Sequence, residues 1–398
     1  MSSSSSQPLS GRRIWIAGIG GAGMSAYALL AHAWGAEVAG WDRNETPYLA
    51  HLDGIEVTLA PEPPQPPAGW EAYVSTAYAD RVAGRPRADL LAELVSLRRS
   101  VVVAGAHGKT TTTGMVAFCL DRLGLEPAFL IGGEIPQLGG NARAGSGWLV
   151  VEGDESDRSV AALRPEVAVL LNVDLDHHTT FSSREEVERM FADWLGQVPH
   201  VVRAAELAPV ELELAVPGEH NRRNAAAALA ALELMGVARD EAARVLVEFR
   251  GAGRRLEPKG EAGGVRVLDS YAHHPAELEA DVAAVRGREG RVLALFQPHL
   301  YSRTRHLAHG FARALATADA ACVTEIYPAR ERPLPGVSGR LIVDELAALR
   351  PGMRIGWAPT LADGAAIVAG WARPGDVVLT LGAGDVDAAA PALLERLA

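Results

Sequence analysis

The chain has 398 residues, of which 48% are hydrophobic and 22% are charged, and its formal net charge is −11. This length predicts about two to four domains, and the negative charge disfavours a nucleic-acid or anionic-membrane partner. Two cysteines, Cys119 and Cys322, exclude a disulfide framework and a cysteine metal cluster. No stretch reaches the roughly eighteen apolar residues of a membrane span, so we expect a cytoplasmic protein without membrane insertion.

The first predicted element is a strand at Arg13–Ala17, followed by the glycine-rich sequence GIGGAG at 18–23 and a helical run. A second strand at 37–39 leads to Asp42, the spacing at which a dinucleotide-binding fold places its ribose-binding acid. Prolines break regular structure over 61–70, which we expect to be a surface loop. A leucine-rich helix then ends near 97–100, where we place the first domain boundary.

The second predicted block opens with AGAHGKTTTTG at 104–114, between a buried strand at 101–103 and a helix. Its lysine, Lys109, stands out because the chain has thirty-six arginines and one other lysine, Lys259. Glycines at this turn let backbone N–H groups surround phosphate oxygens, the lysine reaches the terminal phosphates, and a following hydroxyl reaches magnesium. We therefore predict a nucleotide-binding loop comprising Gly105, Ala106, His107, Gly108, Lys109, Thr110 and Thr111.

Two apolar strands of this block end in metal-binding groups. The strand at 148–151 leads to Glu152, and a strand predicted at 167–173 leads to DLDHH at 174–178. Ligands of open α/β sheets bind at this edge, where carboxylate and imidazole groups beside a nucleotide suit magnesium. The predicted metal ligands are Thr110, Glu152 and His177. We interpret the nearby charges of Asp154, Glu155 and Asp157 as a solvated acidic turn.

An alanine-rich helix follows at 217–232. Asn221 and Asn224 lie three residues apart at its start, so both amides could face one ligand, although the segment also fits a well-capped packing helix. The second boundary is expected near 249–253. In the third block, strands again end in polar residues, among them Asp269, Ser270, His273, His299, Arg303 and Arg305. Several such strand ends indicate a shared cleft.

The motifs GIGGAGMSA, AGAHGKTTTTGM, VEGDESD, NVDLDHH, PGEHNRRNAAAALAAL, GRRLE, YAHHPAE, FQPHLYSRT and LGAGD occur in this order between about residues 12 and 385. As a set they resemble the Mur ligases. The resemblance implies a three-domain α/β protein. Its parts are a Rossmann-like UDP-substrate domain at 1–97, a central P-loop ATP-binding domain at 98–249 and a Rossmann-like C-terminal domain at 250–398 that contacts the amino acid and ATP.

The activity implied by the resemblance is ATP-dependent joining of L-alanine to the lactyl carboxylate of UDP-N-acetylmuramate through an acyl phosphate. This reaction belongs to peptidoglycan precursor synthesis and uses Mg²⁺. We expect a monomer or a homodimer. By motif match, the UDP substrate is bound by Gly20, Gly21, Ala22, Gly23, Met24 and Asp42. The further ATP contacts are Asn221, Asn224, Arg255 and Asp269. The catalytic set is Lys109, Glu152, His177, Arg255, His273 and Arg303.

The sequence departs from the family pattern at several places. Ser270 stands where the family has the second acid of Asp-Asp-Tyr, so either Asp269 substitutes or ATP binding is weaker. Leu300 replaces the arginine of the family's PHR sequence, which predicts altered amino-acid recognition. The stretch at 181–217 is short, which predicts a trimmed middle domain. Some Mur ligases use a carbamoylated lysine, but the second block contains only Lys109.

Three alternatives remain open from the sequence. A tripeptide-recycling ligase that uses the same UDP-sugar shares these motifs and would differ near Arg303. An NAD-dependent dehydrogenase would use GIGGAG and Asp42 but would leave the Lys109 loop without a role. A catalytically impaired nucleotide-binding regulator would be in keeping with Ser270.

Overall fold

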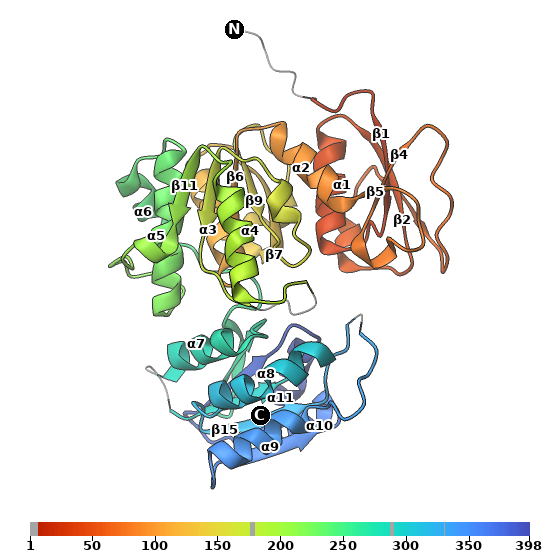
Figure 1. Cartoon of the computed structure of the whole chain (residues 1–398). Helices are drawn as coiled ribbons and strands as arrows, with labels where there is room; N and C mark the ends of the chain where they lie inside the picture. The colour runs from red at the N-terminus through yellow and green to blue at the C-terminus, as the bar shows by residue number, and fades with distance from the viewer. Residues whose placement is uncertain (1–6, 176–179, 287–289, 330) are drawn as a thin grey trace. The chain divides into compact units, whose positions relative to one another are not determined.

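The structure is a computed structural model that describes residues 7–175, 180–286, 290–329 and 331–398. The chain divides into two compact units (Figure 1). Unit 1 comprises Met1–Ala215 and Asn221–Ala252, and unit 2 comprises Val216–His220 and Gly253–Ala398. Unit 1 contains two sheets and unit 2 contains one.

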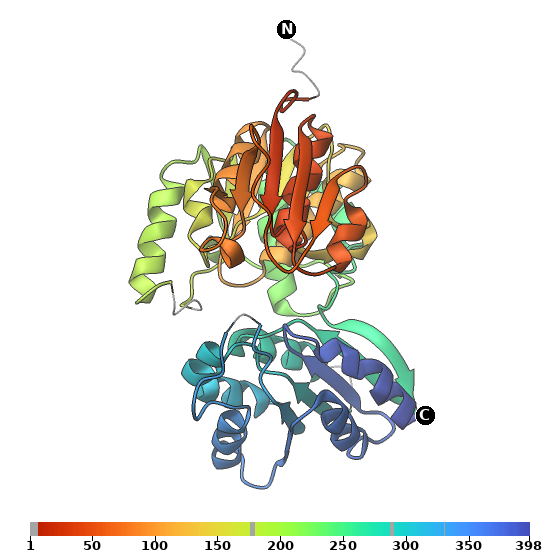
Figure 2. The same ribbon diagram turned by 90° about the vertical axis from the view of Figure 1, so that its right-hand side faces the viewer.

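The first sheet of unit 1 is parallel throughout, and its red and orange arrows point the same way in Figure 2. Parallel strands need crossover connections, which the intervening helices provide. In sheet order its strands are β3 (Glu56–Leu59), β2 (Glu37–Asp42), β1 (Arg13–Ala17), β4 (Glu71–Val74) and β5 (Arg85–Pro86). Its helices are α1 (Ala22–Ala33) and α2 (Arg87–Ser96).

The central sheet of unit 1 is parallel except for the antiparallel pair β7 and β8. Its strands, in sheet order, are β11 (His200–Arg203), β10 (Val167–Leu170), β6 (Ser100–Ala104), β9 (Leu149–Glu152), β7 (Ala128–Ile135) and β8 (Gly140–Arg143). The accompanying helices are α3 (Lys109–Arg122), α4 (Arg184–Leu195), α5 (Glu219–Leu234) and α6 (Arg239–Leu246).

One hydrophobic core joins the two sheets of unit 1. Helix α1 packs against β7 and β8 of the central sheet, and apolar residues of α2, such as Leu90 and Leu94, are fully buried with residues of both sheets. Strand β6 is buried at every position, as expected for a central parallel strand covered on both faces. The glycine turn after β1 is therefore held in a defined position relative to the lysine loop after β6.

Unit 2 has a parallel sheet with one antiparallel edge strand, β12. Its strands, in sheet order, are β12 (Glu257–Ala262), β13 (Val265–Ser270), β17 (Val377–Leu381), β14 (Val292–Phe296), β15 (Ala320–Thr324) and β16 (Arg354–Ala358). The helices are α7 (Pro275–Arg286), α8 (Tyr301–Leu315), α9 (Arg340–Leu349), α10 (Leu361–Ala369) and α11 (Ala389–Leu397). Among the described residues, no helix combines the length and hydrophobicity needed to cross a bilayer.

One predicted strand is shorter than expected. The strand predicted at 167–173 ends at Leu170, although the Leu171 amide still donates a hydrogen bond to the carbonyl of Ala104. Beyond this point the chain leaves the sheet, and the Asn172 side chain bonds to the loop that follows β6. Asn172, which was predicted to lie in the strand, instead holds the lysine loop through these hydrogen bonds.

Candidate functional site

The lysine loop connects β6 to α3, and its glycines are required by the backbone. Gly105 and Gly108 have φ values of +132° and +84°. A Cβ atom at Gly105 would lie 2.8 Å from the backbone oxygen of Asn172, and one at Gly108 would lie 2.5 Å from Oδ1 of Asn224. Only glycine fits both conformations and both close approaches.

The Lys109 side chain is held at the mouth of this loop by buried partners. Its Nζ lies 2.9 Å from both carboxylate oxygens of Glu155 and 2.7 Å from the carbonyl oxygen of Gly105. Burial alone would lower the lysine pKa, but the charge and hydrogen bonds of Glu155 outweigh it, so the pKa of Lys109 is raised. The ammonium group is therefore charged and placed at the carboxyl edge of the central sheet.

The acidic turn after β9 differs from its predicted environment. The interpretation as a solvated turn is wrong for Glu155, which is only 3% exposed because it pairs with Lys109. Asp154 and Asp157 are also engaged, since both accept hydrogen bonds from the guanidinium of Arg87. The turn is thus an organised set of ion pairs rather than a solvent-facing charge cluster.

Thr110 and Glu152 come together beside the lysine. The Thr110 hydroxyl lies 3.1 Å from Oε1 of Glu152, and the backbone N–H of Gly132 donates to Oε2 at 2.7 Å. A hydroxyl and a carboxylate are hard oxygen donors, the ligand type that Mg²⁺ prefers. Two of the three predicted metal ligands therefore fit a magnesium ion, whereas His177 lies outside the described residues.

The other predicted nucleotide contacts surround the same loop. The backbone N–H of His107 donates to Oδ1 of Asn172 at 2.8 Å, and the Asn172 amide donates back to the His107 carbonyl at 2.9 Å. Asn221 and Asn224, both nearly buried on α5, are joined by a 3.3 Å hydrogen bond. Asn224 also packs against Gly108. Ala106 is in the loop, and Thr111 is buried in the first turn of α3.

The first glycine turn connects β1 to α1 and has no lysine. The backbone N–H of Gly20 donates to Oδ2 of Asp42 at 2.8 Å, and the hydroxyl of Thr46 donates to the Gly20 carbonyl at 2.7 Å. The Asp42 carboxylate thus binds the turn itself. Met24 lies in the core, and only 3% of the residue is exposed.

A mostly apolar pocket of about 700 Å³ is lined by residues close to this turn. Thr46, which bonds to Gly20, forms part of its wall, and Leu59 pairs with Asp42 across the sheet. The remaining lining residues are Glu45, Pro47, Leu49, Ala50, Leu52, Ile55 and Val57. The sequence prediction identified the turn but not this pocket, because its residues carry no motif.

Unit 2 brings three further predicted residues together. The Arg255 Nη1 atom lies 3.6 Å from Oε1 of Glu277, and Oε2 of Glu277 accepts the backbone N–H of His273 at 3.0 Å. The rings of His273 and His299 are 6.1 Å apart, and Nδ1 of His299 lies 3.4 Å from Nη1 of Arg303. Arg255, His273 and Arg303 therefore belong to one polar cluster at the ends of β13 and β14.

Asp269 and Ser270, at the end of β13, are both completely buried. Asp269 accepts hydrogen bonds from Nε of Arg254 at 2.8 Å and from the Thr380 hydroxyl at 2.6 Å. The Ser270 hydroxyl donates to the carboxylate of Asp281 on α7. Burial raises the pKa of Asp281 to about 6. Both residues thus have partners inside unit 2, and the sequence pattern did not single out Asp281.

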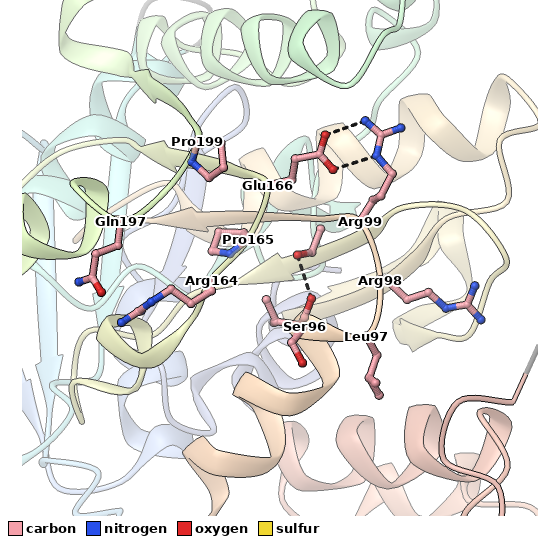
Figure 3. Close-up of a pocket in the computed structure, with 11 residues that line it drawn as sticks. Ser96, Leu97, Arg98, Arg99, Arg164, Pro165, Glu166, Gln197 and Pro199 are labelled. Atoms are coloured by element: carbon pink, nitrogen blue, oxygen red, sulfur yellow. Dashed lines mark hydrogen bonds and ion pairs between the residues drawn. The ribbon is translucent and has the colours of Figure 1, made fainter. Parts of the chain in front are cut away.

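A separate pocket of about 520 Å³ lies in unit 1 at the amino ends of β6 and β10 (Figure 3). Three arginines line it, but they do not converge. Arg99 forms a bidentate ion pair with Glu166, and Arg98 and Arg164 extend in opposite directions (Figure 3). Ligands of open α/β sheets bind at the carboxyl ends of the strands, so this pocket is at the opposite edge from the nucleotide loop.

These features place the protein among three-sheet α/β proteins that carry a glycine-rich loop with a lysine at the carboxyl edge of the central sheet. Sequence profiles narrow the class, because the Mur ligase middle domain matches residues 103–202 and the Mur ligase glutamate ligase domain matches residues 254–384. The chain is 40% identical over 447 aligned positions to the UDP-N-acetylmuramate–L-alanine ligase of Streptomyces coelicolor, with 96% of each protein covered. It is 39% identical to that of Rubrobacter xylanophilus, covering 97% of this chain and 100% of the relative. The chain belongs to the Mur ligase family.

A solved structure is also similar over nearly the full length. The UDP-N-acetylmuramate-alanine ligase MurC of Thermotoga maritima superposes with a TM-score of 0.78 at 26% identity, covering 96% of this chain and 98% of that one. This similarity confirms the predicted three-domain α/β fold class. The 447 positions aligned with the Streptomyces relative exceed the 398 residues of this chain, so that relative contains segments without a counterpart here.

Proposed function

We propose that this chain joins L-alanine to the lactyl carboxylate of UDP-N-acetylmuramate, converting ATP to ADP and phosphate, in the cytoplasm. The observation that carries the proposal is the grouping of Lys109, Thr110 and Glu152 at one sheet edge in a chain of the Mur ligase family. The similar proteins from Streptomyces and Rubrobacter are both named for this reaction, which favours L-alanine over a tripeptide.

We assign the UDP-sugar to the first domain, residues 1–97. The turn Gly20–Met24 is suited to the diphosphate because the backbone N–H groups of Ala22–Met24 begin α1, and a helix N-terminus attracts anions. The pocket lined by Thr46 and Leu59 is large enough for a nucleoside. Asp42, already bonded to Gly20, would shape the turn beside the uridine. This arrangement disfavours a dehydrogenase, in which the acid binds a ribose hydroxyl.

ATP would bind to the central domain, residues 98–249. The Gly105–Thr111 segment would surround its phosphates, with Asn221 and Asn224 behind Gly108. In the first step, an oxygen of the substrate carboxylate attacks the γ-phosphorus, the bond to the β–γ bridging oxygen breaks, and ADP leaves. Lys109 would stabilise the charge on the transferring group, a task of position and electrostatics.

In the second step, the neutral amine of L-alanine attacks the acyl phosphate carbon, and the resulting tetrahedral species expels phosphate, which takes up the proton that the nitrogen loses, to leave the amide. Residues 250–398 would supply Arg255 to ATP, and His273 and Arg303 to the carboxylates of the two acids. The internal partners of Asp269 give it a role in supporting the Arg254 side chain, so its contribution to ATP binding would be indirect. A bidentate arginine fork is the preferred partner of a carboxylate.

Thr110 and Glu152 would hold Mg²⁺, with His177 as a third candidate ligand. The ion, when bound, neutralises charge on the phosphates. The two oxygen donors already lie close together, so little rearrangement of these side chains is needed.

The direct test is to mix the protein with ATP, Mg²⁺ and UDP-N-acetylmuramate and to vary the amino donor. We expect L-alanine to give stoichiometric ADP, phosphate and a product whose mass equals the UDP-sugar plus alanine minus water. Phosphate release that requires a tripeptide would instead identify the recycling ligase. Failure of every donor in a folded protein that binds ATP would support the impaired regulator.

A further inference from the structure

Arg87 is the first residue of α2, and it reaches the acidic turn that follows β9 in unit 1. Its Nη2 atom lies 2.7 Å from Oδ2 of Asp157 and 3.0 Å from Oδ2 of Asp154, while Nε lies 2.9 Å from the same Asp157 oxygen. The side chain is only 18% exposed. Two nitrogens of the guanidinium are thus committed to the turn that carries Glu155, the partner of Lys109.

The third nitrogen, Nη1, is directed to the other glycine turn. A Cβ atom built at Gly23 would lie 3.5 Å from Nη1 of Arg87 and 3.8 Å from the hydroxyl of Tyr27. No residue within the described ranges accepts a hydrogen bond from this nitrogen. Burial raises the pKa of Tyr27 to about 12, so its hydroxyl stays neutral beside the cation.

The acids that hold Arg87 are themselves fixed. Oδ1 of Asp154 accepts the backbone N–H of Ser156 at 2.9 Å, and Oδ1 of Asp157 accepts that of Ser159 at 3.0 Å. Their other oxygens orient the guanidinium, leaving one edge facing Gly23. A charged group that is oriented by neighbouring hydrogen bonds binds an anion with little loss of side-chain entropy.

We infer that Arg87 is a positioning residue that joins the two phosphate-binding turns. Two of its nitrogens hold the acidic turn beside Lys109, and Nη1 donates a hydrogen bond to the diphosphate of a UDP-sugar bound at Gly20–Gly23. The inference rests on the proposed binding of a UDP-sugar at this turn. This role explains why Arg87 of α2 lies beside the first glycine turn, because residues 18–24 of that turn include no basic residue.

The test compares the affinities of UDP and uridine for the full-length protein by titration calorimetry. The variants are Arg87→Gln, Arg87→Lys and the control Arg85→Gln, whose side chain is more than half exposed and pairs with Asp89. We expect wild type and the control to bind UDP more tightly than uridine. Arg87→Gln should lose at least about tenfold of the UDP affinity and none of the uridine affinity, because it removes a charge-assisted hydrogen bond to the diphosphate. Arg87→Lys, which keeps the charge, should recover part of the loss.

A second variant tests the link to the acidic turn. Asp157→Asn leaves Nη1 in place but weakens its support, so it should reduce UDP affinity by a few-fold, and Arg87→Gln/Asp157→Asn should be no worse than Arg87→Gln alone. Equal UDP binding by Arg87→Gln and wild type, or fully additive losses in the double variant, would overturn the inference. If wild type fails to bind UDP, the proposed function fails instead. Should Arg87→Gln not fold, the folded Arg87→Lys variant decides: a partly reduced preference for UDP over uridine is expected, and a preference equal to that of wild type would overturn the inference.

Discussion

The two glycine turns of unit 1 have the same strand–turn–helix form but use their glycines differently. In the lysine loop, the positive φ of Gly105 and Gly108 and their close neighbours exclude any side chain. In the first turn, Gly18 is constrained in the same way, with a φ of +81° and a virtual Cβ 2.6 Å from Oγ of Ser75. Gly21 is not, because its φ is −72° and the atom nearest to its virtual Cβ is 3.5 Å away. A virtual Cβ at Gly23 likewise lies 3.5 Å from its nearest neighbour, Nη1 of Arg87. The fold therefore does not require glycine at 21 and 23, which is in keeping with the proposed close approach of a diphosphate.

The turns also differ in the origin of their cation. The lysine loop carries Lys109 at the first residue of its own helix, whereas the first turn faces Arg87, which is more than sixty residues away in the sequence. A cation beside a glycine turn can thus be encoded locally or supplied by the tertiary fold. Only the first kind is visible as a motif.

The largest effect is expected for Lys109→Arg, which tests whether the local cation must be a lysine. A planar guanidinium cannot take the compact position between Glu155 and the Gly105 carbonyl. We expect kcat for product formation to fall by roughly a thousandfold or more, as for loss of other phosphoryl-transfer cations. Lys259→Arg is the matched control, because Lys259 pairs with Glu257 on β12 and should tolerate the change. A normal rate for Lys109→Arg would remove its assigned role.

Matched alanine substitutions in the two turns give the next largest effect. Gly105→Ala forces a side chain into a left-handed conformation against Asn172, so the free energy of unfolding should fall by about 1–3 kcal/mol or more. Gly21→Ala should leave thermal unfolding unchanged but weaken UDP binding, measured by calorimetry, because its methyl group occupies the approach to the helix N-terminus. Unchanged UDP affinity in Gly21→Ala would show that the diphosphate does not approach this residue.

The sequence predicted the local parts of this site and not the long-range ones. The strand–turn–helix form around Lys109 follows from an all-apolar strand, two glycines and a helix, which are all contiguous. The burial of Glu155 could not be predicted, because a carboxylate in a polar run is usually solvated and becomes buried only when the fold delivers a cation. Arg87 belongs to no motif, and its partners are about seventy residues away.

The same distinction explains the shortened strand β10. The apolar residues at 167–171, followed by Val173, predict a longer strand, but Asn172 between them forms two hydrogen bonds with His107, and the chain leaves the sheet there. Neither the Asn172 pairing nor the Ser270–Asp281 hydrogen bond has a signal in residue spacing. Both hydrogen-bonded pairs form only because the tertiary fold brings separate elements of the chain together.

The smallest effect concerns a strand end in unit 2 where an acid is buried against a hydroxyl instead of a cation. Asp281 accepts a hydrogen bond from Ser270, with Arg255 and Glu277 as the nearby charged groups, and burial raises its pKa to about 6. A raised carboxyl pKa means that the folded state holds the proton more tightly than the unfolded state. Ionisation of Asp281 therefore destabilises the fold fully above about pH 6 and not at all below the unfolded pKa of about 4.

Asp281→Asn keeps an acceptor for Ser270 and removes the titration. The free energy of unfolding of Asp281→Asn, measured by urea denaturation, should exceed that of wild type by roughly 2 kcal/mol more near pH 7.5 than near pH 4.5. Asp344→Asn, at an exposed site on α9, should show no such pH-dependent difference. A difference of the opposite sign would mean that Arg255 stabilises Asp281 as a carboxylate, in the way that hydrogen bonds from Ser156 and the charge of Arg87 together lower the pKa of Asp154.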